Sequence, residues 1–416
     1  MEDIKKIPAL RFPEFSGEWE VKKLEKCNLK VIDGDRGKNY PNGNDFSKNG
    51  YCLFLNAKNV TKNGFSFEEK YFITKEKDEN LSKGKLKRHD IILTTRGTVG
   101  NISYYNEKIN FKHIRINSGM VLIRNENETI KPEFLYKQFN SPVLSKQIKK
   151  IAFGSAQPQL TVKEIKKFKI STAEPNEQQK ISDFLTKIDT KIEQLTKKKQ
   201  LLESYKKGVM QKIFSQELRF KDDEGEDYPD WEEKRLGEIC NIKRGASPRP
   251  IADSKWFDEN SNIGWVRISD VTKSKKYLNK TTQYLSNEGV KKSRLIEKGS
   301  LIMGICATIG KPIYTNFTVC IHDGFVVFDK LSENKEFIYY YLDMIKKTWY
   351  KYGQPGIQVN LNSNIVSSEK INLPSIPEQT KIANFLTKID NKINLVEKQL
   401  TDSKQYKKSL LQQMFV

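Results

Sequence analysis

The sequence has few cysteines and no apolar run long enough to cross a bilayer. The five cysteines form no CxxC pair and are odd in number, which argues against a disulfide framework or a zinc site. They are Cys27, Cys52, Cys240, Cys306 and Cys320. We expect buried free thiols in a reducing compartment. No stretch of about 18 apolar residues occurs, and the opening MEDIKKIPALRF has no apolar signal core. These absences predict a cytoplasmic protein.

The usual motifs of enzymes that act on DNA are also missing. There is no Pro-Pro dipeptide, which excludes the NPPY loop of amino-methyltransferases, and no GxGxxG cofactor loop. The segment GICATIGKP (304–312) imitates a P-loop, but it has five residues between its glycines and a proline after Lys311. The three histidines are isolated, and the carboxylates Asp230 and Glu232 lie too close together for a nuclease site. We therefore predict a chain that is not an enzyme and holds no metal.

Positive charge, by contrast, is abundant. The 73 lysines and arginines exceed the 52 acidic residues and give a net charge of +21. Such an excess is typical of proteins that bind a polyanion, most often nucleic acid. Lysine far outnumbers arginine and asparagine is common, so the codon bias of a low-GC genome is the alternative explanation. We favour nucleic acid as the partner.

One segment of 38 residues occurs twice in the chain. Residues 177–214 align without a gap with residues 378–415, and 18 of the 38 positions are identical. The densest part reads FLTKIDTKI in the first copy and FLTKIDNKI in the second. The two copies lie 201 positions apart, a period that fits a whole domain followed by a helix. The order domain, helix, domain, helix follows.

Both repeated segments have the heptad spacing of a coiled coil. The apolar positions are Ile181, Leu185, Ile188, Ile192, Leu195, Leu202, Val209 and Ile213 in the first copy, and Ile382, Leu386, Ile389, Ile393, Val396, Leu400, Leu410 and Met414 in the second. Lys199, Lys206, Ser403 and Lys407 occupy the remaining seam positions. Each helix would be about 57 Å long. Its start is marked by a proline and an early glutamate.

An apolar stripe on so long a helix needs a partner, and we expect the two helices to pair in antiparallel fashion. Asp189 would then lie near Tyr406 and Lys407, and Asp390 near Tyr205 and Lys206. Two unrelated helices, each packed on its own domain, are the alternative. The identity extends to exposed polar positions, however, which suggests that both copies present one outer surface to two copies of a partner.

The segments that precede the helices also resemble each other. LRF at 10–12 recurs at 218–220, HDIILTTRGTVGN (89–101) aligns with GSLIMGICATIGK (299–311), and NSGMVLIRN (117–125) aligns with HDGFVVFDK (322–330). Short β-rich runs and helical stretches at 133–150 and 336–351 indicate a mixed fold. The predicted fold class is α+β, with two similar recognition domains, two helices in an antiparallel coiled coil and pseudo-twofold symmetry. We place the domains at 1–174 and 217–376, and the helices at 175–216 and 377–416.

This ordered combination resembles the specificity subunit of type I restriction–modification enzymes. The features that carry the resemblance are the EQQKI and EQTKI openings before FLTKID, the divergent domains between near-identical helices, and the QPQL…EIKKFKI segment. The resemblance covers essentially the whole chain. It implies that each globular domain reads one half of a bipartite, asymmetric DNA site and that the helices set the spacing between the halves.

The resemblance also implies partners and their cofactors. Two methyltransferase subunits would dock on the helices, and two restriction subunits would join the larger complex. S-adenosylmethionine, ATP and Mg would be bound by those partners, with no cofactor in this chain. For docking we nominate equivalent residues on the two helices: Phe184, Lys187, Asp189, Lys191, Phe385, Lys388, Asp390 and Lys392.

Candidate DNA-contacting residues are polar side chains in loops where the two domains differ. In the first domain these are Arg36, Lys38, Lys58, Asn59, Arg96, Gln157 and Gln159. In the second they are Arg244, Arg249, Arg267, Asp270, Gln354, Gln358 and Asn360. For each of them, an ordinary surface residue or a turn hydrogen bond is the alternative.

Two other functions remain open at this stage. One is an orphan DNA-binding specificity protein without restriction partners. The other is a coiled-coil structural or RNA-binding protein, which would favour exposed aromatic residues for base stacking. Tyr104, Tyr105 and the run Tyr339–Tyr341 could supply such residues, although the run lies in an expected helix.

Overall fold

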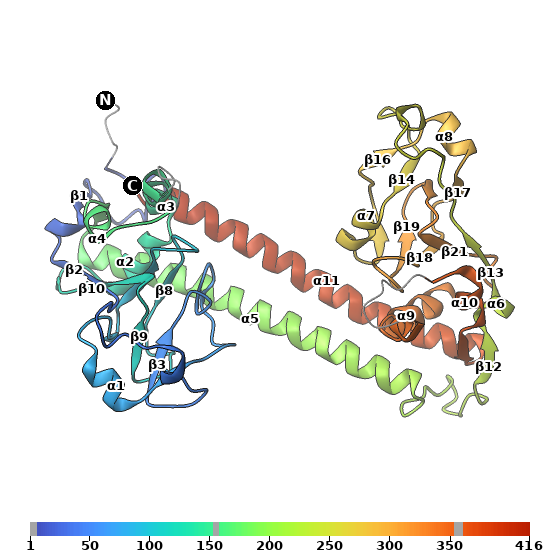
Figure 1. Cartoon of the computed structure of the whole chain (residues 1–416), viewed down its shortest axis with the longest axis horizontal. Coiled ribbons are helices and arrows are strands. Elements are labelled where there is room, and N and C mark those ends of the chain that lie inside the picture. Colours follow the sequence, from blue (N-terminus) through green and yellow to red (C-terminus); the bar gives the residue numbers. More distant parts are fainter. Residues whose placement is uncertain (1–5, 153–157, 353–360) are drawn as a thin grey trace. The chain divides into compact units, whose positions relative to one another are not determined.

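The computed structural model describes residues 6–152, 158–352 and 361–416. The chain divides into two compact units. Unit 1 comprises residues 1–196 and 398–416, and unit 2 comprises residues 197–397. Each unit therefore contains one globular domain together with part of each long helix, α5 (Pro175–Phe214) and α11 (Ile376–Gln413). The mixed helix and sheet content confirms the predicted fold class (Figure 1).

In unit 1 the globular domain holds two principal sheets. The first has the order β2-β10-β7-β8 and the second β6-β3-β9, with minor pairs β1-β11 and β4-β5. The strands are β1 (Glu20–Lys23), β2 (Leu29–Asp33), β3 (Cys52–Leu55), β4 (Val60–Thr61), β5 (Gly64–Phe65), β6 (Phe72–Ile73), β7 (Ile91–Thr94), β8 (Ile102–Tyr104), β9 (Ile114–Ile116), β10 (Met120–Asn125) and β11 (Lys169–Thr172). The helices are α1 (Lys75–Asn80), α2 (Pro132–Phe139), α3 (Pro142–Ala152) and α4 (Val162–Ile165), with 3-10 turns η1 (Leu24–Lys26) and η2 (Gly43–Asp45).

Unit 2 repeats this plan. The order β13-β21-β18-β19-β15 matches the first sheet of unit 1 with β15 added, and β16-β14-β20-β17 matches the second sheet with β17 added. In a minor pair, β12 pairs with β22. The strands are β12 (Glu232–Arg235), β13 (Asn241–Arg244), β14 (Gly264–Val266), β15 (Tyr277–Leu278), β16 (Gln283–Tyr284), β17 (Arg294–Ile296), β18 (Leu301–Gly304), β19 (Pro312–Thr315), β20 (Val319–Ile321), β21 (Phe325–Asp329) and β22 (Lys370–Leu373). The helices are α6 (Leu236–Ile239), α7 (Ile268–Lys273), α8 (Asn287–Lys291), α9 (Lys335–Ile345) and α10 (Ser363–Ser368), with η3 (Ser254–Trp256) and η4 (Thr348–Tyr352).

The predicted strands and helices are confirmed where the apolar pattern was clearest. The runs DIILTT, GMVLIR, SLIMGI and FVVF form β7, β10, β18 and β21, all of which are largely buried. The predicted helical stretch 133–150 is divided into α2 and α3 near Asn140, whose backbone N–H still bonds to carbonyls at the end of α2. Gly97, Gly100 and Gly310 have positive φ angles, which glycine adopts without steric cost in turns.

Each unit closes its core with both long helices. In unit 1, Ile181 and Leu185 of α5 pack with Leu410 and Met414 of α11 and with Trp19 of the globular domain. The start of α5 therefore lies beside the end of α11. Because the seam positions are apolar at these points, the contact removes both stripes from water.

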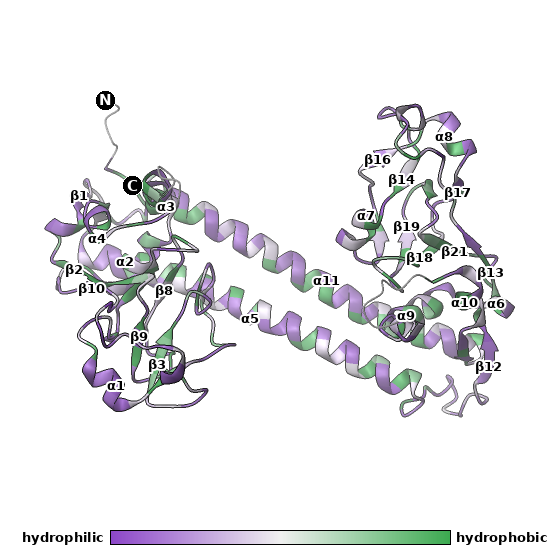
Figure 2. Ribbon diagram, viewed as in Figure 1, coloured by the Kyte–Doolittle hydropathy of each residue, from purple (hydrophilic) through white to green (hydrophobic). Residues whose placement is uncertain are grey.

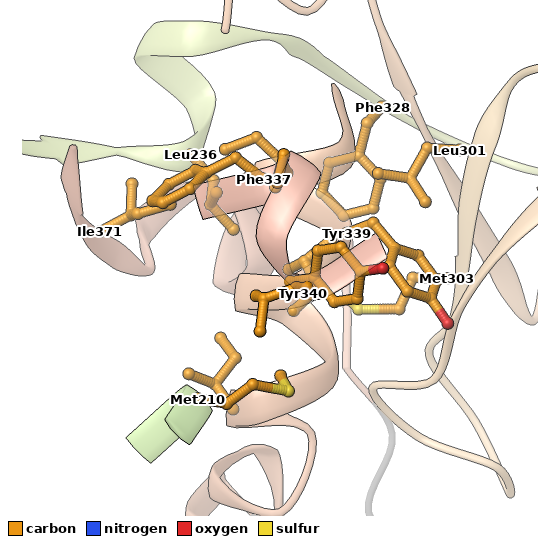
Figure 3. Packing of buried hydrophobic residues seen from close by; sticks show 14 of the residues in the cluster. Met210, Leu236, Leu301, Met303, Phe328, Phe337, Tyr339, Tyr340 and Ile371 are labelled. Carbon is orange, nitrogen blue, oxygen red and sulfur yellow. The ribbon is translucent and has the colours of Figure 1, made fainter. Parts of the chain in front are cut away.

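Unit 2 shows the reciprocal contact. Val209, Met210 and Ile213 at the end of α5 join a large cluster with Ile382 and Leu386 at the beginning of α11. Figure 3 shows Met210 beside the aromatic side chains of α9 in this cluster. The bands of apolar and polar residues along both helices can be followed in Figure 2. The contacts of the two units together confirm the antiparallel pairing.

The predicted register is confirmed as well. In unit 1 the Lys407 Nζ lies 2.6 Å from an Asp189 carboxylate oxygen. In unit 2 the Lys206 Nζ lies 2.6 Å from an Asp390 carboxylate oxygen. Among the described residues, no helix is both long and apolar enough to cross a membrane.

All five cysteines are free, as expected. Four of them are buried, whereas Cys306 is partly exposed. Tyr104 and Tyr105 are buried with exposures of 7% and 2%, and Tyr340 of α9 is fully buried. None of these three tyrosines offers an exposed ring for base stacking, which weakens the RNA-binding alternative.

Candidate nucleic-acid interface

In both units a glycine lets the loop after a strand approach a turn closely. Gly34 follows β2 and Gly245 follows β13, and their amides donate to the carbonyls of Met120 (3.3 Å) and Phe325 (2.9 Å). A Cβ at Gly34 would lie 2.2 Å from the Asn117 carbonyl oxygen, so no other residue fits there without moving the backbone. The equivalent distance from Gly245 to the His322 carbonyl oxygen is 2.1 Å. The two turns, residues 117–119 and 322–324, therefore face the loops that carry candidate DNA-contacting residues.

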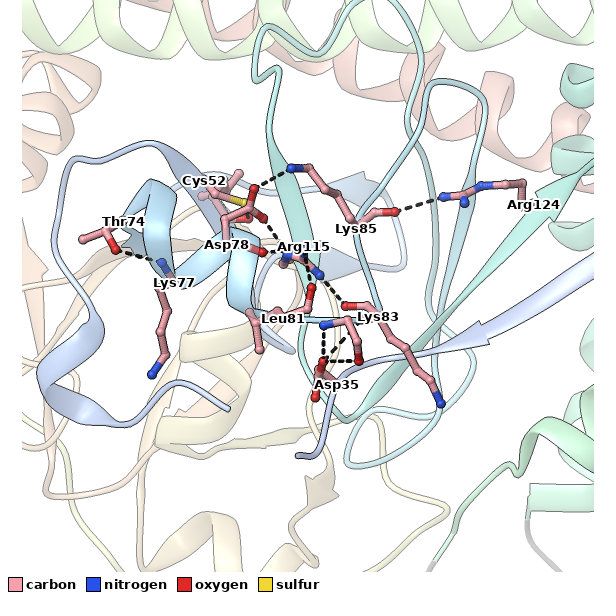
Figure 4. A network of polar contacts seen from close by, with 12 residues as sticks. Asp35, Cys52, Thr74, Lys77, Asp78, Leu81, Lys83, Lys85, Arg115 and Arg124 are labelled. Carbon is pink, nitrogen blue, oxygen red and sulfur yellow. Dashed lines mark hydrogen bonds and ion pairs between the residues drawn. The ribbon is translucent and has the colours of Figure 1, made fainter. Parts of the chain in front are cut away.

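In unit 1 the loop after β2 is fastened by Asp35. Its carboxylate accepts hydrogen bonds from the amides of Gly37 (2.9 Å), Ser82 (2.7 Å) and Lys83 (3.2 Å), and from the Ser82 hydroxyl (3.0 Å) (Figure 4). Burial opposes ionisation of this carboxyl, but the hydrogen bonds outweigh it and lower its pKa to about 2. The loop that carries Arg36 is thus tied to the turn at 82–83.

The turn at residues 82–83 is held by the buried ion pair between Arg115 and Asp78. Arg115 donates to the Asp78 carboxylate (2.5 Å) and to the carbonyls of Lys83 (2.6 Å) and Leu81 (2.9 Å), and Lys85 also pairs with Asp78. The Asp78 side chain is fully buried. Burial raises its pKa, yet the two cations beside it hold the pKa below its ordinary value. A buried network with this many satisfied donors makes the turn rigid.

A pocket of about 280 Å³ opens beside the Arg36 loop of unit 1. Three of the predicted residues, Arg36, Arg96 and Gln159, line it together with Lys163 and Asp33. Arg96 is exposed, and within the described part of the chain its guanidinium has no hydrogen bond or ion pair. The structure therefore brings together three residues that are far apart in sequence. The three cations Arg36, Arg96 and Lys163 around one polar cavity suit a phosphate or a base edge.

The equivalent loops of unit 2 carry different side chains. Asp323 accepts from the Ser247 hydroxyl (3.0 Å) and from the Arg249 guanidinium (2.8 Å), while its backbone carbonyl accepts from Arg244 Nε (2.7 Å). Burial opposes ionisation of Asp323, but these partners keep its pKa below the ordinary value. Cys306 takes the place of Arg96, and burial raises the pKa of its thiol. The two candidate interfaces thus share a backbone and differ in chemistry.

Two of the predicted DNA-contacting residues are buried in the structure. Asn59 is 1% exposed; its side-chain Nδ2 donates to the Ser66 and Glu69 carbonyls, and its Oδ1 accepts from the Asn56 backbone amide. Asp270 is 5% exposed and accepts from the Arg267 and Thr282 amides. Both buried side chains hydrogen-bond within their own loops, which accounts for their polar character without DNA.

The other nominees divide into exposed and undescribed residues. Lys38 is exposed, Lys58 pairs with Glu69 at 2.9 Å on the surface, and Arg267 is partly exposed at the start of α7. Gln157, Gln354, Gln358 and Asn360 lie outside the described residues. A role in DNA binding for these residues stays a prediction.

The nominated docking residues fall into three groups. The lysines 187, 191, 388 and 392 are exposed on the helices. Phe184 and Phe385 are half-buried against Phe12 and Phe220, with ring centroids 5.7 and 5.4 Å apart. The third group, the two aspartates, is paired within the chain.

Asp189 and Asp390 join each helix pair to its globular domain. Asp189 also binds Lys137 Nζ (2.5 Å), and Asp390 also accepts from the Tyr340 hydroxyl (2.7 Å). Burial lowers the pKa of Lys137, and the nearby Asp189 acts in the opposite sense. The identity of these aspartates in the two copies therefore has a structural explanation, while docking stays a prediction.

Sequence reasoning missed the role of the repeated glutamates. Glu177 is fully buried and bonds to Arg11 with two contacts of 2.7 Å and to Trp19 Nε1 (3.2 Å). Glu378 has the same partners in unit 2, Arg219 (2.8 Å) and Trp231 (3.2 Å). LRF recurs at 218–220, and Trp19 recurs as Trp231; these repeats were the signal that could have revealed both pairs.

The glutamines that follow these glutamates, Gln178 and Gln379, also make equivalent contacts in the two units. Gln178 accepts from the Lys131 amide (2.8 Å) and donates to the Thr129 and Ala173 carbonyls. Gln379 accepts from the Asn334 amide (2.9 Å) and donates to the Pro374 carbonyl (2.9 Å). The Glu-Gln dipeptide thus fixes each helix start to its own globular domain.

This architecture, two variable polar surfaces on one repeated scaffold joined by paired helices, defines a DNA-recognition chain. The family model of the type I restriction modification DNA specificity domain matches residues 16–204 and 228–403. The chain belongs to this family and is a non-catalytic specificity subunit of a type I restriction–modification system.

Similar proteins agree with this assignment. The putative type I restriction enzyme MjaX specificity subunit of Methanocaldococcus jannaschii is 24% identical, with 99% of this chain and 95% of that protein aligned. The MjaVIII specificity subunit of the same organism is 26% identical over 99% and 94%.

Solved structures share the fold. The S subunit of the type I system from M. genitalium has a TM-score of 0.60 at 15% identity, over 99% of both chains. A structure described as showing the complex assembly and conformational transition of the type I R-M system has a TM-score of 0.57 at 18% identity, over 94% of this chain and 96% of that one.

Proposed function

We propose that the two globular domains bind the two halves of a bipartite, asymmetric DNA site. The observation that carries this proposal is the difference in side chains at equivalent places of one scaffold. Asp33 in unit 1 corresponds to Arg244 in unit 2, because β2 and β13 pair in the same way with β10 and β21. Arg96 corresponds to Cys306, because β7 and β18 also pair in the same way with β10 and β21. Surfaces with different donors and acceptors select different base sequences.

The helices, in this proposal, set the unread spacer and dock two methyltransferase subunits. Equivalent exposed lysines recur on α5 and α11, notably Lys187 with Lys388 and Lys191 with Lys392. A surface that occurs twice can bind two copies of one protein. Two restriction subunits would complete the larger complex, and the partners would bring S-adenosylmethionine, ATP and Mg.

The decisive experiment is to map methylated adenines in the host genome with and without this chain. We expect one motif with two unequal halves and a fixed spacer, lost when the chain is deleted. A single continuous motif, or no change on deletion, would contradict the proposal. Co-purification of a methyltransferase in about twofold excess would distinguish it from an orphan specificity protein.

Sequence swaps would then assign the halves. Replacing residues 1–174 by the corresponding domain of a relative should change one half of the motif and leave the other intact. Replacing residues 217–376 should do the reverse. A change of both halves by either swap would be inconsistent with one domain reading one half.

A further inference from the structure

The turns 117–119 and 322–324 are equivalent by hydrogen bonding as well as by sequence. The Thr95 amide donates to the Gly119 carbonyl (2.8 Å), and the Ile305 amide donates to the Gly324 carbonyl (2.9 Å). These bonds fix Ser118 and Asp323 as corresponding residues.

Each of these two residues holds a guanidinium on its backbone carbonyl. Arg36 Nη2 lies 3.2 Å from the Ser118 oxygen, and Arg244 Nε lies 2.7 Å from the Asp323 oxygen. The two arginines do not occupy corresponding positions. Arg244 corresponds to Asp33, and Arg36 corresponds to Ser247. In both units an arginine binds the equivalent backbone carbonyl, but the two arginines are at non-equivalent positions in the sequence.

Fold stability does not account for this convergence. A hydrogen bond from an exposed side chain contributes little to stability, and the Arg36 side chain is 46% exposed. Arg36 is also held by Asp33 at 2.9 Å, and the Asp323 carbonyl holds Arg244 through its Nε alone. Each guanidinium is therefore oriented at the surface with further N–H groups available for an acceptor.

We propose that the carbonyls of Ser118 and Asp323 are arginine seats, and that Arg36 and Arg244 are the equivalent DNA contacts of the two half-sites. The proposal rests on the proposed function and names the residue pair that performs it. A guanidinium fork recognises two acceptors side by side, either guanine O6 and N7 or two phosphate oxygens. Neighbours such as Arg96 in unit 1 and Cys306 in unit 2 then make the two seats different in preference.

A transplant of the seat tests this equivalence. In unit 2 the variant Arg244→Asp removes the guanidinium, and adding Ser247→Arg supplies one from the position that Arg36 occupies in unit 1. Binding of the full-length chain with its co-purified methyltransferase to duplex DNA would be measured by fluorescence anisotropy. The probes are the cognate duplex selected by the wild-type complex and a random duplex.

We expect the single variant to bind the cognate duplex about 5- to 150-fold more weakly, the equivalent of one lost bidentate contact. The double variant should recover most of that loss. A deficit on both duplexes identifies a phosphate contact, and a deficit on the cognate duplex alone identifies a base contact. Both outcomes support the seat.

A matched control is available on the same strand. Lys243→Asp makes the same change of charge, but successive residues of a strand point to opposite faces, and Lys243 pairs with Asp329 at 2.6 Å. Thermal unfolding checks that all variants fold. The seat is overturned if Arg244→Asp binds like the wild type, if Lys243→Asp loses as much, or if the double variant recovers nothing. A wild-type complex that binds no DNA at all would instead overturn the proposed function together with the seat.

Discussion

At the scale of single residues, the buried carboxylate of Glu177 deserves a direct measurement of stability. Its partners Arg11 and Trp19 reach it from the beginning of the chain, and it is fully enclosed. Replacement by alanine leaves the buried indole N–H of Trp19 without an acceptor and removes the charge partner of Arg11, which among the described residues keeps only the Ser16 and Gly17 carbonyls. We expect Glu177→Ala to lower the free energy of unfolding by about 3 kcal/mol. Urea denaturation would measure the loss, with Glu174→Ala as the exposed control.

The pKa of Asp35 makes a second prediction at this scale. The carboxyl titrates near 2 in the folded protein and near 3.9 in an unfolded chain, so the folded state favours its charged form. The resulting stability is fully present above pH about 4 and disappears as the pH falls through about 2. Asp35→Asn should therefore unfold at a lower temperature than the wild type at pH 7.

The same variant has a definite pH dependence. The difference in melting temperature between Asp35→Asn and the wild type should shrink steadily as the pH is lowered from 5 to 3. A difference that stays constant over this range would show that the Asp35 charge contributes nothing. Glu76, an exposed residue of α1, offers a control in which no such trend is expected after replacement by glutamine.

Residue type and loop position predicted part of the candidate surface. Arg36, Arg96 and Gln159 lie in polar loops and line one pocket, while their contact with DNA stays a prediction. Asn59 and Asp270 belong to equally polar loops, but their side chains satisfy buried backbone groups. Both uses require a polar side chain in a turn, so composition alone cannot distinguish a residue that faces DNA from one that holds the loop.

At the scale of elements, the helices were the most predictable part of the chain. Heptad spacing sets which face is buried, and an antiparallel pair of two similar sequences has few possible registers. The pairs Asp189–Lys407 and Asp390–Lys206 follow from that register. The short strands β14 and β20 pair in parallel, and their sequences contain no signal for that choice. Their partners are set by contacts distant in sequence.

Exchange of charges tests the register in solution. Lys206→Asp and Asp390→Lys each place like charges together, and the two side chains are only 15% and 19% exposed. We expect each single change to destabilise the protein and the double change to restore a coupling energy of about 1 kcal/mol or more. Chemical denaturation of all four proteins gives this coupling. The exposed Lys207, combined with Asp390→Lys in the same way, should show none.

At the scale of the whole molecule, one scaffold appears twice with different side chains on its loops. The shared parts are those that bury apolar surface or satisfy buried charges, such as the Glu-Gln helix starts. The different parts include exposed loop residues nominated for DNA, such as Arg36, Arg96 and Arg244. If these loops read DNA as proposed, stability and specificity depend on largely separate sets of positions, and one set of loops can change without loss of the fold.

The proposed role of the helices as a spacer makes the last prediction. Two readers on one side of B-DNA lie roughly 34–36 Å apart, and paired helices hold such a separation more firmly than a flexible linker. Insertion of four residues within 190–205, with a matching insertion within 391–406 to keep the pairing, adds about 6 Å of helix. The methylated motif should then gain about one or two base pairs of unread spacer, since each pair occupies about 3.4 Å. Long-read sequencing of methylated adenines would show the new motif, and a glycine-rich insertion of equal length should blur the spacing instead. If the helical insertion leaves the motif unaltered, the helices do not set the spacer.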